Sequence, residues 1–246
     1  MSSEAAQLLD LNEHGLDPDD RPQTSDSDLF MQLLVLEAAP DRKIGRCTSS
    51  LLQVLKRKRI PAVAYESLNR PDCVGLLSWN EDPTQFLSRL RPVLAKREGH
   101  GLRALPQFSM VGRTYSTGRE DDLEDWLRHR PVRAVLDRDW PWAVWYPLRR
   151  SGTFERLDEP TRTQVYQDHA RVGSDYAEAG LVRDIHLRCV GLDENDNDLL
   201  VGLIGRDLRP LSQLVQSMRV TRHTSEFVTR MGPFFVGRAV WRQSDA

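Results

Sequence analysis

Two stretches of this chain carry the same short sequences in the same order, and this repetition constrains the fold more than any other feature. Residues 74–76 read Val-Gly-Leu and return as residues 201–203, and Pro83 returns as Pro210 at the same spacing. Residues 111–113 read Val-Gly-Arg and return as residues 236–238 at almost that spacing. Three echoes in order indicate an internal duplication.

The first copy predicts a defined series of strands and helices. Apolar runs and alternation predict four strands, at residues 29–38, 62–68, 74–79 and 108–116. A helix follows the first strand, and a second helix begins at Asp82-Pro83. Their predicted buried faces consist of leucine and phenylalanine: Leu51, Leu52 and Leu55, then Phe86, Leu87, Leu90 and Leu94. The order strand, helix, strand, strand, helix, strand is that of a ferredoxin-like unit, and the second copy repeats it.

The expected fold class is therefore α+β: tandem ferredoxin-like repeats of the dimeric α+β barrel type, with antiparallel sheets that carry helices on one face. The expected boundaries are an extended arm at 1–27, repeats at 28–118 and 139–246, and a linker at 119–138. The face of each sheet without helices must be covered by the other sheet, another subunit or a ligand.

Composition excludes some partners. The net charge of -2 gives no bulk attraction to nucleic acid or to an anionic membrane, and no apolar run is long enough to span a bilayer. The three cysteines are scattered, which argues against disulfides and thiolate metal sites and favours a reducing compartment. We expect a cytoplasmic protein without nucleic-acid or membrane partners.

A helix predicted after Asp158 holds the first candidate functional residue. Asp158 is suited to cap the helix, and Val165, His169, Val172 and Tyr176 recur on one face of it. His169 is the only polar member of this stripe, so an imidazole points inward. Spacing alone leaves two alternatives open, a satisfied core histidine and a ligand.

The strand predicted at residues 184–190 presents a second candidate surface. Alternation places Asp184, His186 and Arg188 on one face and apolar residues on the other. That polar face is either solvated or directed at a buried ligand, and the role of His169 decides between these alternatives.

Four motifs together resemble one family. Tyr146-Pro-Leu-Arg-Arg, Asp168-His169, Gly191-Leu-Asp and Gly232-Pro-Phe-Phe-Val-Gly-Arg are similar, in order and spacing, to motifs of the chlorite dismutase and coproheme decarboxylase superfamily (HemQ-like proteins). The resemblance implies tandem ferredoxin-like barrels assembled as homo-oligomers, commonly pentamers. It also implies a haem b or coprohaem, an iron porphyrin, in the C-terminal half, with His169 as the metal ligand.

The resemblance implies further site residues. Tyr146 matches a tyrosine that contacts a propionate and takes part in decarboxylation as the radical-bearing residue. Arg150 falls where the decarboxylases place a propionate-binding lysine, and Arg222 and Ser225 fall in a region that supplies further cofactor contacts.

Two positions depart from the chlorite dismutase pattern. Asp184 stands where those enzymes carry a distal arginine, and a carboxylate would repel chlorite. Ile204 stands where a glutamate hydrogen-bonds the ligand histidine. We therefore expect that chlorite is not the preferred substrate, and that Asp184 and His186 act as distal acid-base groups on bound hydrogen peroxide.

The predicted function is a haem-binding oxidoreductase of this superfamily, peroxide-dependent and related to coproheme decarboxylase. Two alternatives remain. One is a non-catalytic protein that binds or transfers haem or another porphyrin, and the other is a haem-free, ring-forming structural member.

Overall fold

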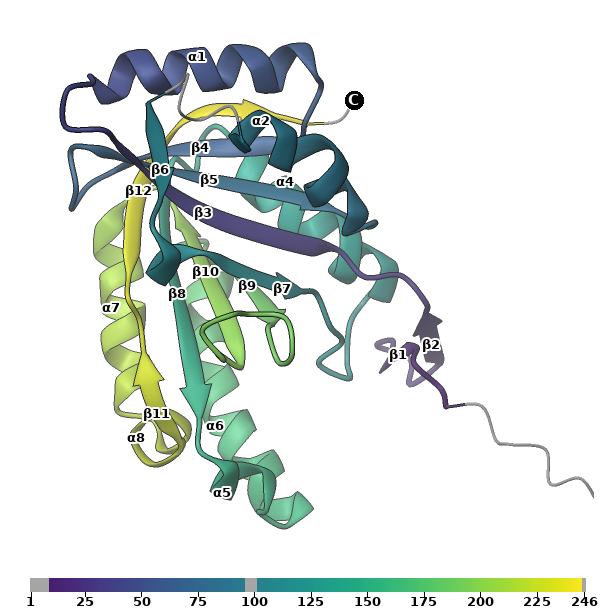
Figure 1. Ribbon diagram of the computed structural model, residues 1–246. Helices are drawn as coiled ribbons and strands as arrows, with labels where there is room; N and C mark the ends of the chain where they lie inside the picture. Colours follow the sequence, from purple (N-terminus) through teal and green to yellow (C-terminus); the bar gives the residue numbers. More distant parts are fainter. Residues whose placement is uncertain (1–8, 96–100, 245–246) are drawn as a thin grey trace, which may run out of the picture.

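Eight antiparallel strands close into a ring in the computed structural model, which describes residues 9–95 and 101–244 (Figure 1). Around the ring the order is β7, β3, β5, β4, β12, β8, β10 and β9, and β9 returns to β7 through the pair Arg113 and Arg188. The strands are β3 (Phe30–Ala38), β4 (Ala62–Ser67), β5 (Cys73–Asn80), β7 (Met110–Arg113), β8 (Trp142–Arg150), β9 (Arg183–Arg188), β10 (Leu199–Gly205) and β12 (Phe235–Gln243).

The two halves of the ring have the same internal order. In each half the fourth strand pairs with the first, the first with the third and the third with the second, giving β7-β3-β5-β4 and β12-β8-β10-β9. This is the ferredoxin-like order. The predicted α+β class with antiparallel sheets is confirmed.

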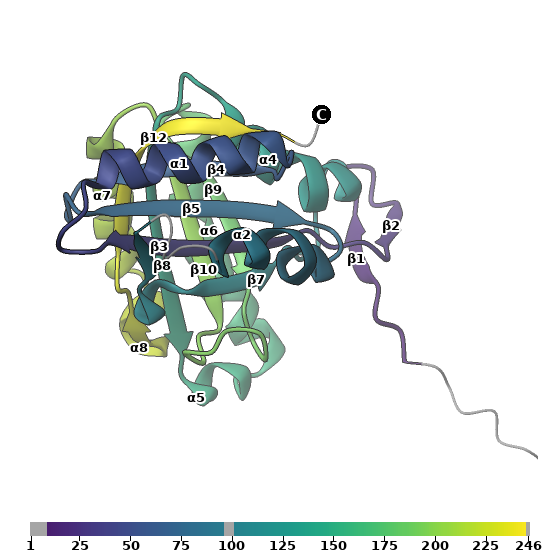
Figure 2. The same ribbon diagram turned by 45° about the horizontal axis from the view of Figure 1, so that its top comes forward.

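Helices cover the outside of the ring. In Figures 1 and 2, α1 and α2 lie over the first sheet, and α6 and α7 lie over the second. The helices are α1 (Ile44–Arg57), η1 (Phe86–Leu90), α2 (Arg91–Ala95), η2 (Pro106–Phe108), η3 (Asp125–His129), α4 (Arg130–Leu136), α5 (Gly152–Glu155), α6 (Glu159–Glu178), α7 (Leu208–Arg219) and α8 (Arg222–Phe227). Among the described helices, none is long and apolar enough to cross a membrane.

One apolar core fills the inside of the ring, with side chains from both halves, among them Met31, Leu33, Tyr65, Leu77, Trp145, Ile185, Leu187 and Phe235. The repeated glycines make room for two of these rings. A Cβ added to Gly75 would lie 2.4 Å from the Phe235 ring, and one added to Gly202 would lie 2.3 Å from the Trp145 ring. Close packing of aromatic rings therefore gives a physical reason for the Val-Gly-Leu echo.

The structure differs from the sequence expectations in three local places. The described part of the arm contains a hairpin of β1 (Glu13–Leu16) and β2 (Pro22–Ser25), which Arg113 contacts through Glu13. The fourth strand of the first repeat is shorter than predicted, and β6 (Leu102–Ala104) pairs with β3 before it. Leu87, expected on a buried face, is 59% exposed because η1 is a π-helical turn, whose wider winding rotates Leu87 outward.

The segment at 119–138 is mostly helical and closes one end of the barrel. Ala134 and Val135 of α4 are buried against the inner core, and Val132 and Leu136 pack beside them. This packing also directs Arg130 towards β9, where it meets Asp184.

Candidate functional site

A small cavity lies between the outer face of the second sheet and the helices α6, α7 and α8. Its volume is about 40 Å³. Its walls are mostly apolar, and its polar members include four residues singled out from the sequence: Tyr146, His169, Asp184 and His186. Residues that are distant in the sequence thus meet at one place on the C-terminal half.

His169 reaches this cavity from the middle of α6. Asp158 caps the start of the helix by accepting a hydrogen bond from the Thr161 N–H at 3.0 Å, as predicted. The imidazole Nδ1 lies 2.8 Å from the hydroxyl of Thr221. That hydroxyl donates its one proton to the Met218 carbonyl, so it accepts from Nδ1 and the proton of the ring resides there.

This arrangement leaves Nε2 of His169 with a lone pair. Within the described chain Nε2 has no hydrogen-bond partner, and the residue lines the cavity. Burial, with a smaller effect from His186, lowers the pKa of His169 to about 4. A neutral imidazole with one nitrogen held and the other directed into a cavity is the form that ligates metals.

Asp184 and His186 enter the cavity from β9. The predicted alternation is confirmed, because Ile185 and Leu187 between and beyond them are buried inside the barrel. Arg130 donates to the Asp184 carboxylate at 2.7 Å, and the other carboxylate oxygen lies 3.5 Å from Nε2 of His186.

The Asp184 carboxylate is ionised. Its burial opposes ionisation, but His186 and Arg130 outweigh burial, and the pKa lies below its usual range. A carboxylate held in this way accepts hydrogen bonds well and donates a proton poorly.

Tyr146 forms part of the cavity wall on β8. Its ring is buried and stacks on Phe234 with 4.7 Å between the ring centroids. Burial and the nearby Asp184 raise the pKa of the phenol, so the hydroxyl keeps its proton.

The other three predicted cofactor contacts lie outside this cavity. Arg150 donates to the Tyr166 hydroxyl and pairs with Glu155 at 3.2 Å. Arg222 and Ser225 lie on the exposed side of α8, where Arg222 pairs with Glu226 and the Ser225 hydroxyl donates to the Thr221 carbonyl. From this segment Thr224 lines the cavity instead, and Thr221, the residue before α8, contacts His169, while Arg222 and Ser225 point outward.

Ile204 is buried inside the barrel, on the face of β10 opposite the His169 cavity, which Val201 and Leu203 line. No side chain at position 204 could reach His169, so the structure does not support the predicted match of Ile204 to the glutamate. The residue that holds the His169 imidazole is Thr221, which follows the C-terminal end of α7, and no sequence pattern indicated this contact.

His223 is the most unusual group beside the site, and no sequence pattern pointed to it. It is 4% exposed, and neither ring nitrogen has a hydrogen-bond partner within the described residues. Its ring lies 4.6 Å from that of His169 and stacks against Tyr166. Burial, together with His169 and Arg150, lowers its pKa to about 3.

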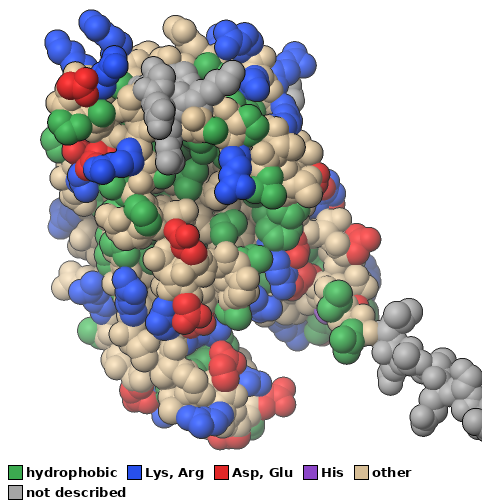
Figure 3. Space-filling view, viewed as in Figure 1, with side chains coloured by type: hydrophobic (Ala, Val, Ile, Leu, Met, Phe, Trp, Pro, Cys, Tyr) green, Lys and Arg blue, Asp and Glu red, His purple; other side chains and the backbone are tan. Residues whose placement is uncertain are grey.

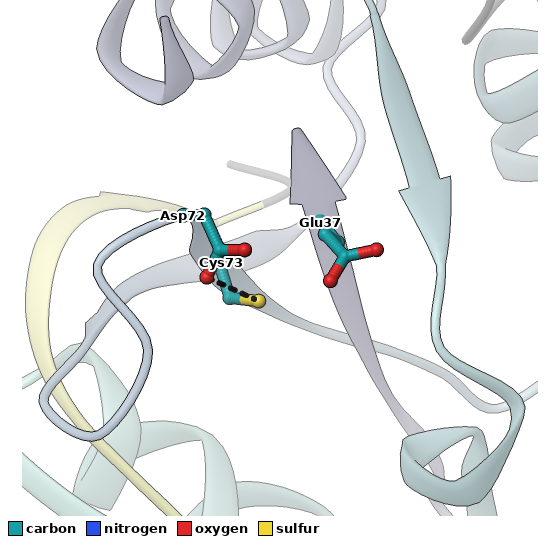
Figure 4. Close-up of side chains that lie close together, drawn as sticks. All are labelled: Glu37, Asp72 and Cys73. Atoms are coloured by element: carbon teal, nitrogen blue, oxygen red, sulfur yellow. Dashed lines mark hydrogen bonds between the residues drawn. The ribbon is translucent and has the colours of Figure 1, made fainter. Parts of the chain in front are cut away.

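A second cluster of possible metal ligands lies on the first half (Figure 4). Glu37 on β3 faces Asp72 and Cys73 at the start of β5. Arg70 and Arg103 both donate to Glu37, and burial raises the pKa of the Cys73 thiol to about 11. Two guanidinium groups and a protonated thiol make this an ion-pair cluster and not a metal site.

Comparison with known proteins shows which solved structures share this fold and which family the sequence matches. No curated protein matches the sequence. Among solved structures, a haem-binding protein from Thermus thermophilus is similar with a TM-score of 0.69 and 16% identity, over 87% of this chain and 91% of that one. A variant of the chlorite dismutase from Candidatus Nitrospira defluvii is similar with a TM-score of 0.66 and 15% identity, over 87% and 92%. The sequence model named chlorite dismutase matches residues 105–240, more than half of the chain, and this protein therefore belongs to the chlorite dismutase family.

Proposed function

We propose that this protein binds an iron porphyrin through His169 and catalyses a peroxide-dependent oxidation at it. The observation that carries the proposal is the state of His169: neutral, fixed through Nδ1 by Thr221, and open at Nε2 towards an apolar cavity. A similar protein from Thermus thermophilus is described as haem-binding, which supports an iron porphyrin as the bound group.

The donor chemistry of the cavity fits an iron porphyrin, whereas its present width does not. A neutral imidazole suits iron, and the aliphatic walls suit the faces of the macrocycle. The volume of about 40 Å³ holds little more than one water molecule. Binding therefore requires α6 to move away from the sheet.

Gly173 makes this opening easier. It lies four residues after His169 on the same helix face, and among the described residues the only atom near its Cβ position is the Met218 methyl at 3.2 Å. Met218 is a flexible side chain that can swing aside. Glycine inside a helix costs stability, so its presence here is consistent with a need for space.

A bound iron porphyrin would supply the redox chemistry, and the chain would supply the remaining groups. Thr221 keeps the His169 ring oriented, and His186 provides a nitrogen that can take a proton from a peroxide and return it. Asp184 orients His186 through its second oxygen, while Arg130 compensates its charge.

The same groups bear on the choice of substrate. Arg130 pairs with Asp184, so its charge is already compensated. An anionic oxidant needs a cation in the cavity to stabilise it, but here the Asp184 carboxylate lines the cavity. This favours neutral hydrogen peroxide over chlorite. Tyr146 and Arg150 remain the proposed contacts of the propionates, with Arg222 and Ser225 at the outer edge. Either haem b or coprohaem is compatible with these groups.

A second candidate is non-catalytic porphyrin binding or transfer. The ion pair of Asp184 with Arg130 favours it, because a carboxylate with a lowered pKa cannot serve as the proton donor for cleavage of an O–O bond.

The two candidates are separated by loading the protein with haem and, in parallel, with coprohaem and then adding hydrogen peroxide. Absorbance follows peroxide consumption, and mass spectrometry follows loss of carboxylate from the porphyrin. Catalysis predicts turnover that falls roughly 10²-fold or more in His186→Ala. A protein that holds the porphyrin but consumes no peroxide above the free porphyrin is a carrier.

A further inference from the structure

Positive charge is concentrated in and around α1, although the whole chain carries a net charge of -2. Residues 42–59 contain seven Lys and Arg residues and no Asp or Glu. Figure 3 shows Lys and Arg side chains around the top of the molecule, where Figure 1 places α1. The local charge of this surface, and not the net charge of the chain, determines which partners it attracts.

The side of α1 that faces away from the sheet carries three of these cations. Arg46, Lys56 and Arg57 are exposed, and the helical period of about 3.6 residues places them on the half of the helix opposite the buried Leu51. We call this side, with its three cations, the α1 face. Within the described part of the chain, the only ion pair of a cation from residues 42–59 joins Arg42 to the neighbouring Asp41. The charge of the α1 face is therefore uncompensated.

The stability of α1 does not account for its charges. Cations at the C-terminal end suit the helix dipole, but Arg46 lies in the first turn and Lys43 is the N-cap, where positive charge opposes the dipole. The side chain of Lys43 makes no capping hydrogen bond. By contrast, α6 has Asp158 as a hydrogen-bonded cap and Glu159 in its first turn. Cations at the end of α1 where they reduce helix stability favour a role in binding an anionic partner.

An apolar groove lies next to this helix, along η1 and α2. Its volume is about 550 Å³, and its apolar walls include Leu34, Leu36, Phe86, Leu87, Leu90 and Leu94. Leu87 is 59% exposed, and Arg91 also lines the groove. An exposed leucine at an open apolar groove indicates contact with an apolar partner.

The α1 face and the groove belong to one side of the molecule. Arg89 of η1 donates to the carbonyls of Lys58 and Arg59 at 2.7 and 3.0 Å, which attaches η1 to the end of α1. In Figure 2 both α1 and α2 lie on the near side of the first sheet. None of the residues that line the groove lines the His169 cavity. The first half thus presents cations and an apolar groove together, away from the site of the second half.

We propose that the first half binds peripherally to an anionic lipid surface, with the α1 face on the headgroups and with Leu87 and the groove against acyl chains. A bilayer with anionic headgroups combines negative charge with apolar chains, so it complements both features. A nucleic acid would match the cations but would leave the groove without an apolar partner.

Sedimentation of the full-length protein with lipid vesicles tests the electrostatic part of this contact. Arg46→Gln/Lys56→Gln/Arg57→Gln removes the three cations of the α1 face, and glutamine keeps a good helix propensity. Each cation near an anionic membrane contributes about fivefold in affinity, so binding to vesicles of phosphatidylcholine and phosphatidylserine falls about a hundredfold. Vesicles of phosphatidylcholine alone bind the native protein much more weakly than the mixed vesicles.

The matched control removes three cations from the second half. Arg171→Gln/Arg209→Gln/Arg219→Gln changes exposed positions on α6 and α7 and alters the net charge by the same amount. This control binds the mixed vesicles as the native protein does. A native protein that does not bind the mixed vesicles, or equal losses in the two triple variants, overturns the proposal.

Leu87→Gln tests whether the partner is a lipid and not another polyanion. The variant loses contact with acyl chains, so its affinity for the mixed vesicles falls at least about threefold. Because Leu87 is largely exposed, the circular dichroism spectrum stays native. Equal vesicle binding by Leu87→Gln and the native protein, or tighter binding of the native protein to a DNA duplex than to the mixed vesicles, refutes the proposal. Porphyrin binding is measured separately, so a failure here leaves the proposed function standing.

Discussion

The two halves of the barrel share one strand order but differ in the layer between sheet and helices. In the first half, α1 buries Cys47, Leu51 and Leu55 against an aliphatic sheet face. In the second half, the corresponding helix α6 buries only Val165 fully and presents His169.

The second strands of the two halves show the same difference. The outward residues of β4 include Ala62 and Ala64, which pack under α1, whereas those of β9 include Asp184 and His186, which line the cavity. The inward residues are apolar in both halves, so the barrel core is shared and the outer layer is where the halves diverge. Two halves with the same strand order can thus differ in their outer layers, with an apolar helix layer in one half and a cavity with polar side chains in the other.

Acid should affect the second half much more than the first. His169 and His223 have pKa values of about 4 and 3 in the folded chain, below about 6.5 for an unfolded histidine. As the pH falls, the unfolded chain binds protons at these two histidines before the folded chain does. The contribution of the neutral histidines to stability is therefore complete above about pH 6.5 and is lost as the pH falls towards 4. Each imidazole should remove about 2.5 kcal/mol from the free energy of unfolding at about pH 4.5.

The measurement is urea unfolding at about pH 7.5 and about pH 4.5, on either side of the titration of an unfolded histidine. His223→Phe should lose about half of the pH dependence assigned to the two histidines. His14→Ala, on the exposed hairpin, should leave it unchanged. A pH dependence that is identical in His223→Phe and the native protein would mean that this ring titrates normally.

Truncating a side chain of the apolar layer should lower the free energy of unfolding more than truncating one that lines the site. Leu51 is 2% exposed, so Leu51→Ala should lower the free energy of unfolding by about 2–4 kcal/mol. His186→Ala, at a half-buried polar position, should cost less than about 1 kcal/mol. Chemical denaturation at neutral pH compares them. Equal losses would remove the distinction between a structural and a functional layer.

Replacing His223 should stabilise the chain at neutral pH. Both ring nitrogens are buried without partners in the described chain, so His223→Phe removes two unsatisfied groups and should raise the free energy of unfolding by about 1–2 kcal/mol. Thermal unfolding measures the change. A destabilised variant would indicate that the imidazole has a partner in solution.

Gly173→Ala should have a small and stabilising effect. Alanine suits the interior of α6 better, by up to about 1 kcal/mol, and its methyl group displaces only the flexible end of Met218. The variant should also bind porphyrin more weakly, because the cavity loses space. A lower stability together with unchanged porphyrin affinity would show that Gly173 serves only packing.

The barrel could be predicted from the sequence because its signals are local and occur twice. Strand alternation and the repeated Val-Gly-Leu motif follow directly from side chains that share one core. The Asp158 cap and the polar face of β9 were predictable for the same reason, since neighbours in sequence determine each of them.

The partners of the site residues could not be predicted. Thr221 and Arg130 meet His169 and Asp184 only after α7 and α4 have packed against the barrel, and no periodicity records such contacts. His223 lies in a short helix without a repeating pattern. Arg222 and Ser225 lie in the segment beside the site, but α8 turns Thr224 towards the cavity, and Thr221 before α8 contacts His169.

The most direct test of the central claim is an absorption titration of the purified protein with haem and with coprohaem. The account predicts a saturable Soret shift in the native protein and in His14→Ala. In His169→Ala the shift should be lost, or the affinity should fall by at least about a hundredfold. The same Soret shift and affinity in His169→Ala would show that His169 is not the iron ligand and would contradict the account.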